Sequence, residues 1–524
     1  MIDNPRIGKD VIESLTLGMY EDCKFIYREY IQNSADQIDK AVAEGLIPAG
    51  EDEIHIVINP NKRSIVIEDN ATGIPADRVV PILRNIAHST KKRGENKGFR
   101  GIGRLGGLGY CSKLIFETTY AGEEVKSIMT WDADLLKQII NDRDNSEESV
   151  DVLARVTDTV TKKEAADKHY FKVTLEDVTS NELLDVDRVK KYLSMVAPID
   201  ISSQFIYRSQ INKFIKDNGF KVDIYNIYIN GEQIYKPYTT HIYKEIPGSK
   251  KSIDDILGVG FLMAKDSEGK IIYWGWYSLS HLGGQMERIN IARGIRLRKE
   301  NIQIGDEEIC KKFFAPTDQR FSFYYFGEIH ATSKYLIPNS RRDYFGENKY
   351  LYEFEKCVRY DFMHLKDMCY DASDIRNNLK IINKADELEE KLKDKNDYIS
   401  KKEHVELMQQ LDEYKKKSQK AINQLAKRRA KIEDSDSPLG KIIDKLMPNS
   451  DKLHNGLSLT KASQPVEPET IPKIKYRTDS SIYSKYSKTE RKLIGRIYGS
   501  IANAIPDERQ REALIKVIEE DLTR

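Results

Sequence analysis

REYIQNSADQIDK, at residues 28–40, is the stretch of this sequence that decides the fold. Its apolar residues Ile31, Ala35 and Ile38 recur at helical spacing, which predicts a helix from about Tyr20 to Ala43. This apolar stripe would pack against a core and leave the opposite side of the helix free for polar chemistry.

The polar face of this helix carries Glu29, Asn33 and Asp36, which fall at i, i+4 and i+7 and therefore share one side. Asn33 can offer a neutral oxygen to Mg²⁺, which takes few protein ligands and completes its shell with waters and phosphate oxygens. Glu29 can orient and deprotonate a water aimed at a phosphate. Taken alone, the pattern also fits a solvated polar helix face.

A β-hairpin is expected next, with strands at 54–58 and 64–68. The second strand runs into IEDNATGI, at residues 67–74, which puts the carboxylate of Asp69 at a strand end. Such a carboxylate can accept a hydrogen bond from the exocyclic amine of adenine, whereas the carbonyl oxygen of guanine would be repelled. Gly73 would let the backbone approach the base closely. An ordinary Asp-Asn turn is the other interpretation.

Six glycines fall within GFRGIGRLGGLG, at residues 98–109. Three of them fit GxxGxG, a pattern whose exposed backbone N–H groups can cradle phosphates at a helix start. No Gly-Lys-Ser/Thr follows, which excludes a Walker A loop, and the glycines do not occupy the first turn of a Rossmann unit. Taken alone, a Gly-rich loop can also reflect packing. The residues expected to face the nucleotide are Gly98, Arg100, Gly101, Ile102 and Gly103.

Together and in this order, ExxxNxxD, DxxxG and GxxGxG resemble the N, first glycine and second glycine boxes of the GHKL superfamily of ATPases. REYIQNSADQIDK is especially similar to the form of the first box in the ninety-kilodalton heat-shock chaperones. The resemblance implies a Bergerat-fold ATPase domain, in which helices pack on a sheet, with ATP and Mg²⁺ as its ligands. It covers about 1–350, strongly for 20–110 and weakly beyond 200.

The resemblance also implies a role for each matching residue. Glu29 would activate the attacking water, Asn33 would coordinate Mg²⁺, and Asp69 would recognise adenine. The glycine loop would form a mobile lid over the phosphates. Outside that loop, the residues expected to bind the nucleotide are Asn33, Asp36, Asp69, Gly73 and Thr174.

Two departures from the family pattern bear on this pocket. The usual first glycine of the DxGxG box is Ala71 here, which would narrow the pocket slightly. The strand expected at 170–178 lacks the Gly-Thr pair that usually lies near the adenine, and Thr174 is the candidate substitute.

A cation from the following domain reaches the γ-phosphate in ATP-hydrolysing members of the superfamily, because the charge on the phosphoryl oxygens must be balanced as the bond breaks. LIPNSRRDYF, at 336–345, looks like the arginine loop of the heat-shock chaperones, so we expect Arg341, and then Arg342, to be this cation. A basic surface loop paired with Asp343 is the alternative. The other candidate segment, 288–305, contains Arg293, Arg296, Arg298 and Lys299.

The whole chain is expected to be an α/β (α+β) protein of several domains, because 524 residues exceed what one core can serve. A helical spacing predicts a coiled coil over Leu388, Leu392, Lys395, Ile399, Leu407, Leu411, Tyr414, Ser418, Ala421 and Leu425. Ser487 and Glu490 form a capping-box pattern before two helices, whose apolar residues are Ile494, Ile497, Tyr498, Ile501, Ile505, Leu514, Val517 and Ile518.

The expected boundaries are an ATP-binding domain at 1–185, a transducer-like α/β domain at 186–355, a helical and coiled-coil region at 356–448, a linker at 449–483 and a helical hairpin at 484–524.

Bulk composition excludes several classes of protein. The formal charge of +1 gives no overall attraction to nucleic acid, and the five cysteines lack the spacing of a disulfide framework or a zinc site. The N-terminus has no signal-peptide pattern, and no run approaches the ~20 apolar residues of a membrane span. We therefore expect a cytoplasmic protein that does not associate with membranes.

The resemblance and the order of the domains imply a Mg²⁺-dependent ATPase that acts as an ATP-gated clamp, a homodimer with chaperone-like or remodelling activity on an unknown protein client. The alternative is a DNA-associated clamp ATPase of the MutL or MORC type, of use in a prokaryotic defence or repair system. Its support is the basic runs at 288–299 and 415–431, and it would make nucleic acid the partner. The second run also fits the solvated face of a charged helix.

Overall fold

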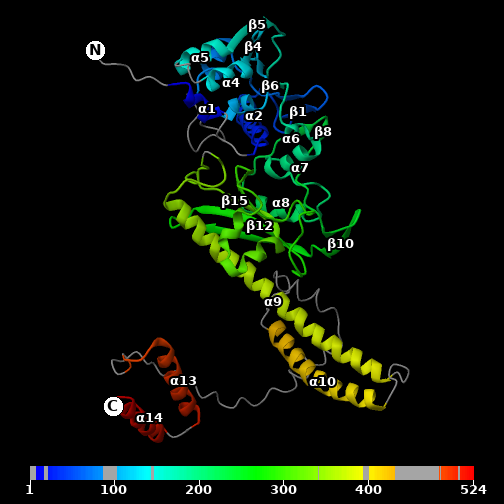
Figure 1. The fold of residues 1–524 in the computed structure, drawn as a ribbon, viewed down its shortest axis with the longest axis vertical. Helices are drawn as coiled ribbons and strands as arrows, with labels where there is room; N and C mark the ends of the chain where they lie inside the picture. The colour runs from blue at the N-terminus through cyan, green and yellow to red at the C-terminus, as the bar shows by residue number, and fades with distance from the viewer. Residues whose placement is uncertain are drawn as a thin grey trace. The chain divides into compact units, whose positions relative to one another are not determined.

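The computed structural model of this chain describes residues 8–16, 22–86, 103–142, 147–339, 341–393, 401–430, 483, 485–504 and 508–523. The chain divides into two compact units, Met1–Pro448 and Asn449–Arg524. Within the described residues, the larger unit contains two mixed sheets followed by a pair of long helices, and the smaller one contains a helical hairpin (Figure 1).

The first sheet of the larger unit has, within the described residues, eight strands in the order β5-β4-β3-β6-β2-β1-β7-β8. Its neighbours pair antiparallel, except that β1 and β7 are parallel. The strands are β1 (Ile54–Asn59), β2 (Ser64–Asp69), β3 (Lys113–Thr119), β4 (Val125–Asp132), β5 (Thr157–Lys163), β6 (Tyr170–Glu176), β7 (Ile227–Ile229) and β8 (Glu232–Gln233).

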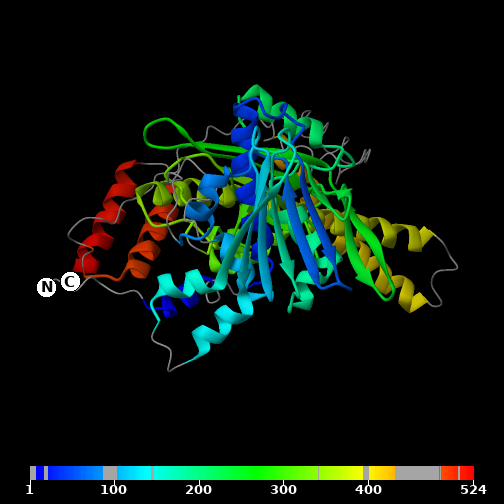
Figure 2. The same ribbon diagram turned by 90° about the horizontal axis from the view of Figure 1, so that it is seen from above.

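Helices cover one face of this sheet. Ile56, Ile67, Val173 and Phe116 are successive cross-strand neighbours that point to the same side, where they join a single core with the helices. Figure 2 shows the strands side by side, with the cyan helices α4 and α5 next to them. The helices are α1 (Asp10–Thr16), α2 (Phe25–Ala43), α3 (Val79–Leu83), α4 (Ala133–Asn141), α5 (Ser149–Val156), α6 (Asn181–Leu184) and α7 (Val186–Val196).

This is the expected helix-on-sheet arrangement. The helix predicted from Tyr20 begins at Phe25, and its three predicted apolar residues Ile31, Ala35 and Ile38 are all buried. The predicted hairpin is also present, because β1 and β2 pair antiparallel up to the turn.

The sheet continues past residue 185, where the sequence predicted the domain boundary. Ile54 of β1 lies beside Ile227 of β7, so a segment assigned to the second domain supplies edge strands to the first sheet. A parallel pair needs a long crossover, and here the crossover includes α7 and α8. The two α/β domains are therefore interleaved in sequence.

The second sheet has the order β11-β12-β15-β13-β14. Alternation along β12 sends Tyr273 and Tyr277 to one face, which packs against α9, and Trp274 and Trp276 to the other, which packs against α8. The elements are α8 (Arg208–Asp217), the hairpin β9 (His241–Ile246) and β10 (Ser249–Asp255), and the sheet strands β11 (Gly258–Lys265), β12 (Ile271–Leu279), β13 (Gly294–Lys299), β14 (Ile302–Ile304) and β15 (Phe326–Ala331).

Two long helices follow, α9 (Lys349–Lys393) and α10 (Lys401–Ala430), and they pack side by side (Figure 1). Leu388 of α9 is buried, and so are Leu411, Ala421 and Leu425 of α10, which belong to the predicted apolar seam. Lys395 and Ile399 of that seam lie outside the described residues, as do residues 449–482 of the predicted linker.

The smaller unit contains α13 (Lys488–Ala504) and α14 (Glu508–Thr523). The predicted capping box is present: the Glu490 carboxylate accepts from the Ser487 backbone N–H at 2.8 Å, and the Ser487 hydroxyl accepts from the Glu490 N–H at 3.3 Å. Tyr498 and Ile515 are buried with Tyr483. The predicted apolar face is only partly buried, because Ile497, Leu514 and Val517 are exposed by 46%, 40% and 61%.

Among the described residues, no helix is both long enough and apolar enough to cross a membrane. All five cysteines carry free thiols.

Candidate functional site

Glu29 lies on the polar side of α2, at the boundary between the two α/β domains, and it is buried there. Its carboxylate is 3.3 Å from the Nε of Arg342, which comes from the loop after β15, and 4.0 Å from the guanidinium of Arg28. All three side chains are buried. Opposite charges this close attract and orient the carboxylate.

The backbone of Arg342 fixes its side chain at Glu29. Its φ of 56° is left-handed, a conformation that a residue other than Gly adopts only when its surroundings enforce it. Those surroundings are hydrogen bonds: the Arg342 N–H donates to the Asn339 carbonyl at 3.2 Å, and its own carbonyl accepts from the Gly305 N–H at 2.9 Å. The strained turn therefore aims the guanidinium into the first domain.

Arg341, which the sequence analysis favoured over Arg342, has an exposed side chain. It reaches the site through its backbone, because its carbonyl accepts a hydrogen bond from Arg28 Nη2 at 3.4 Å. The alternative segment 288–305 supplies no cation to Glu29. Arg293, Arg296 and Arg298 are buried within the second domain, and Arg298 pairs with Glu328 there.

Asp69 lies at the end of β2, with only 3% of its surface exposed. It accepts hydrogen bonds from the Ser34 side chain on α2, from the Ala71 N–H at 3.1 Å and from the Phe171 backbone. Burial raises its pKa to about 6, although these donors act in the opposite direction. The carboxylate is therefore ionised at neutral pH and held between sheet and helix.

The segment after Asp69 is tied to the strands around it. His169 bonds the Ala71 carbonyl at 2.8 Å, and the Ile74 N–H donates to the Thr118 hydroxyl at 2.9 Å. Gly73 has a φ of 68°, and a Cβ there would lie 2.9 Å from the Tyr170 carbonyl oxygen, so only glycine fits. This packing gives a structural reason for the glycine that the motif predicted.

Thr174, the expected substitute near the adenine, lies on the wrong face of the sheet. It pairs with Val66, whereas its neighbour Leu175 pairs with Ile65 on the core face that also carries Asp69. Because side chains alternate along a strand, Thr174 points away from Asp69. Thr118 is the threonine on the Asp69 side, and the sequence analysis did not identify it.

The glycine-rich segment meets α2 at Gly103. A Cβ added there would collide with the Glu29 carboxylate and lie 2.9 Å from its Cδ. Gly106 and Gly107 are equally close to Phe25 and Tyr30, so part of this glycine content reflects packing against α2. The expected phosphate-facing residues Gly98, Arg100, Gly101 and Ile102 lie outside the described residues.

Asn33 and Asp36 follow Glu29 on α2, where Asn33 is half-buried and Asp36 is buried. Among the described residues, no group of three or more His, Cys, Asp or Glu side chains is arranged to hold a metal ion. A Mg²⁺ held by one amide oxygen and by phosphate oxygens needs no such group, so the donor set on α2 fits that form of binding.

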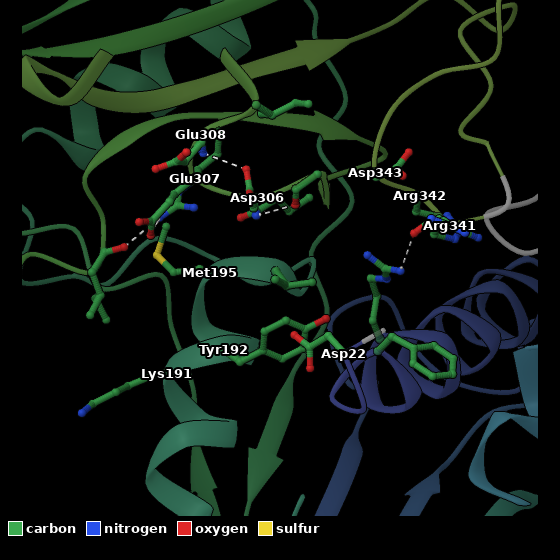
Figure 3. A pocket seen from close by; sticks show the side chains of 18 of the residues that line it. Asp22, Lys191, Tyr192, Met195, Asp306, Glu307, Glu308, Arg341, Arg342 and Asp343 are labelled. Atoms are coloured by element: carbon green, nitrogen blue, oxygen red, sulfur yellow. Dashed lines mark hydrogen bonds and ion pairs between the residues drawn. The ribbon is translucent and has the colours of Figure 1, made fainter. Parts of the chain in front are cut away.

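A cavity of about 1010 Å³ lies between the two domains, beside Arg342. Figure 3 shows Lys191 and Tyr192 of α7 on one side, Asp306 and Glu307 opposite them, and Arg341 and Arg342 at one end. The hydrogen bond from Arg28 to the Arg341 carbonyl joins the two domains at this end of the cavity.

Residues 24–165 match the family model described as "Histidine kinase-, DNA gyrase B-, and HSP90-like ATPase". The N-terminal domain is a GHKL ATPase domain. The match contains the first-box helix, the Asp69 turn and the glycine-rich segment, so the predicted resemblance is confirmed for this region.

Curated relatives of the GHKL domain include three named "Chaperone protein HtpG". The protein from Chlorobium phaeovibrioides is 31% identical over 87 residues, which cover 16% of this chain and 14% of the relative. Those from Burkholderia lata and from Buchnera aphidicola of Acyrthosiphon pisum are each 27% identical over 143 residues, which cover 24% of this chain and 23% of the relative. The chain thus spans less than a quarter of the length of the relatives it matches.

Proposed function

We propose that this protein binds ATP on the face of α2 next to Asp69 and hydrolyses it with Glu29 as general base. The observation that carries the proposal is the meeting of Glu29, from the GHKL domain, with Arg342, from the second domain, at 3.3 Å. Each domain supplies one charged group to the same buried place. A carboxylate and a guanidinium there suit a reaction in which one group deprotonates a water and the other neutralises phosphate charge.

Each residue has one task in this proposal. The ionised Asp69 accepts a hydrogen bond from the adenine amine, and Asn33 holds Mg²⁺, which would neutralise phosphate charge when bound. Glu29 takes a proton from the attacking water through its carboxylate oxygen. When ATP is bound, Arg342 pairs with the γ-phosphate in place of Glu29, which frees the Glu29 carboxylate to act as a base.

The test separates binding from turnover. We expect Glu29→Ala to bind ATP but to lose phosphate release by about 10²- to 10⁴-fold, the usual contribution of a general base. Asp69→Asn should bind ATP about 10- to 100-fold more weakly, because a charge-assisted hydrogen bond is lost. Because burial raises the pKa of Asp69 to about 6, ionisation of this carboxyl at pH 7.5 lowers the free energy of unfolding. A neutral Asn avoids that cost, so Asp69→Asn should not lower the melting temperature. Full turnover in Glu29→Ala would refute the assignment.

We further propose that the protein is a cytoplasmic homodimer that works as an ATP-gated clamp with chaperone-like or remodelling activity on a protein client. The exposed apolar residues Ile497, Leu514 and Val517 support dimerisation, because a hairpin with so small a core gains stability by packing against a second copy. The interdomain cavity leaves room for the two domains to close on nucleotide.

Dimerisation has a direct test in the oligomeric state of the full chain. We expect the double variant Ile497→Lys, Val517→Lys to sediment as a monomer where the wild type sediments as a dimer. The control is Met263→Lys, which places the same charge on an exposed apolar position of β11. A wild-type monomer at micromolar concentration, with or without a non-hydrolysable ATP analogue, would refute the clamp.

The DNA-clamp alternative has less support than the sequence suggested. Of its two basic runs, 288–299 is largely buried, and its Arg296 and Arg298 are held by partners inside the second domain. In the other run, Lys417 pairs with Glu413 and Lys415 lies 3.9 Å from Glu389. Salt-sensitive stimulation of ATP turnover by duplex DNA would restore this alternative.

A further inference from the structure

The second domain carries a polar cluster on the sheet face that packs against α8. Trp274 and Trp276 of β12 lie directly beside His330 and Glu328 of β15. Trp274 and His330 stack with ring centroids 4.0 Å apart. All four side chains are buried, and the proposed ATPase chemistry uses none of them.

A cavity of about 400 Å³ opens onto this face. Most of its walls come from apolar residues of α8 and the chain around it, including Ile199, Ile211, Ile215, Phe220 and Ile224. Asp200, Asn212 and Lys221 line it as well. Figure 1 shows α8 beside the strands of this sheet. The cavity shares none of its lining residues with the interdomain cavity.

The floor of the cavity is charged. Lys236, only 2% exposed, donates to the Asn301 amide oxygen at 2.6 Å and to the Glu328 carboxylate at 2.9 Å. The same carboxylate accepts from Arg298 Nε at 2.6 Å and from the Tyr238 hydroxyl at 2.7 Å. Glu328 therefore faces two buried cations.

When Lys236 is protonated, this residue and Arg298 bring two positive charges to the single negative charge of Glu328. Burial lowers the pKa of His330 to about 4, so this ring is neutral, and its Nε2 bonds Glu328 at 2.9 Å. Asp200 also lines the cavity, but it forms an ion pair with Arg208. Burial, with Arg298 nearby, lowers the pKa of Lys236 to about 7. An excess cation in an apolar surrounding is costly unless a further anion compensates it.

One further donor is left over at the same place. Among the described residues, no acceptor lies within hydrogen-bonding distance of the indole Nε1 of Trp276, which is fully buried and lines the cavity. Lys236 contacts three oxygens, the amide oxygen of Asn301 and both carboxylate oxygens of Glu328, and its ammonium lines the cavity as a positive charge. An indole N–H and an ammonium at the floor of an apolar cavity match the two oxygens of a carboxylate.

We propose that this cavity binds a small monocarboxylic acid with an aromatic or branched apolar body. Its carboxylate accepts from Lys236 and from Trp276 Nε1, and its body lies against Phe220 and the isoleucines of the walls. The volume admits one ring with a short substituent. The site is independent of the proposed ATPase function, because it uses other residues.

The test is saturable binding of benzoate to the full-length protein, followed through tryptophan fluorescence. Two of the three tryptophans of the chain, Trp274 and Trp276, line the cavity, and Trp131 lies in the GHKL domain. We expect benzoate to bind with a dissociation constant below about 1 mM and at least about tenfold more tightly than benzamide, its neutral isostere. Equal binding of the two, or saturation by neither, would overturn the proposal.

Variants locate the site without relying on the buried network. Ile224→Glu places a negative charge at the partly exposed mouth of the cavity and should weaken benzoate binding about tenfold. Ile246→Glu makes the same change on β9, away from the cavity, and should have no effect. Trp276→Phe removes the indole N–H together with part of the buried ring, and it should lower the preference for benzoate over benzamide. Equal effects of the two Glu variants would place the probe elsewhere and refute the site.

Discussion

Substitution of Gly103 by alanine tests the geometry of the hydrolytic site with a single methyl group. The added Cβ would lie 2.9 Å from Glu29 Cδ and still closer to a carboxylate oxygen, whereas ordinary contact begins near 3.4 Å. Glu29 is buried against Arg342 and Arg28, so it has little room to yield. The carboxylate must therefore move by about 1 Å, and a displacement of that size in a catalytic group costs about 10²-fold in rate.

The assay is phosphate release at saturating ATP, with ATP affinity measured in parallel. We expect kcat to fall about 10²-fold in Gly103→Ala while the dissociation constant for ATP changes little, because the backbone N–H groups and Asp69 are unaltered. Gly283→Ala is the matched control, since its Cβ would meet nothing within 4 Å. A Gly103→Ala protein that is folded and keeps a kcat within about threefold of wild type would refute the placement of the glycine segment on Glu29.

Two further predictions concern the adenine side of the site. Because burial raises the pKa of Asp69 to about 6, its carboxylate becomes protonated and loses its acceptor as the pH falls through that value. The affinity for adenosine, which carries no phosphate, should be constant above about pH 7 and fall up to tenfold per unit below about pH 5.5, as measured by calorimetry; a flat profile would contradict the assignment. Thr174→Val should leave ATP affinity unchanged, because this side chain points away from Asp69. Ser34→Ala removes a hydrogen bond to Asp69 and should weaken ATP binding about fivefold. A larger loss of ATP affinity in Thr174→Val than in Ser34→Ala would contradict the observed strand register.

Local patterns predicted the helix α2 and the hairpin of β1 and β2. The spacing of Ile31, Ala35 and Ile38 predicts which side of α2 packs into the core of the first domain, and this in turn places Glu29 on the opposite side of the helix. Asp69 was predictable because a strand pattern ends directly at it. In both cases the information lies within one helix or one strand.

Features that depend on long-range pairing were not predictable in this way. Thr174 was assigned to the pocket because the strand was recognised, but its direction depends on the register with β2, which a one-residue shift would reverse. The boundary at 185 failed to anticipate β7, because its pairing partner β1 is distant in the sequence. Arg341 and Arg342 are adjacent in a basic turn, and only the left-handed backbone at Arg342 distinguishes them.

The C-terminal hairpin illustrates a third limit. Helical periodicity marked Ile497, Leu514 and Val517 as apolar-face residues, yet they remain exposed. Periodicity shows that a face is apolar but not what covers it.

The central claim is that a side chain of the second domain completes the hydrolytic site of the GHKL domain. Phosphate release in a single turnover, measured for Arg342→Ala beside Arg341→Ala, tests it most directly. We predict that Arg342→Ala still binds ATP but releases phosphate about 10³-fold more slowly, as expected for loss of an arginine that stabilises a phosphoryl transition state. The rate of phosphate release by Arg341→Ala should stay within about tenfold of the wild-type rate. Equal rates for wild type and Arg342→Ala would contradict the account.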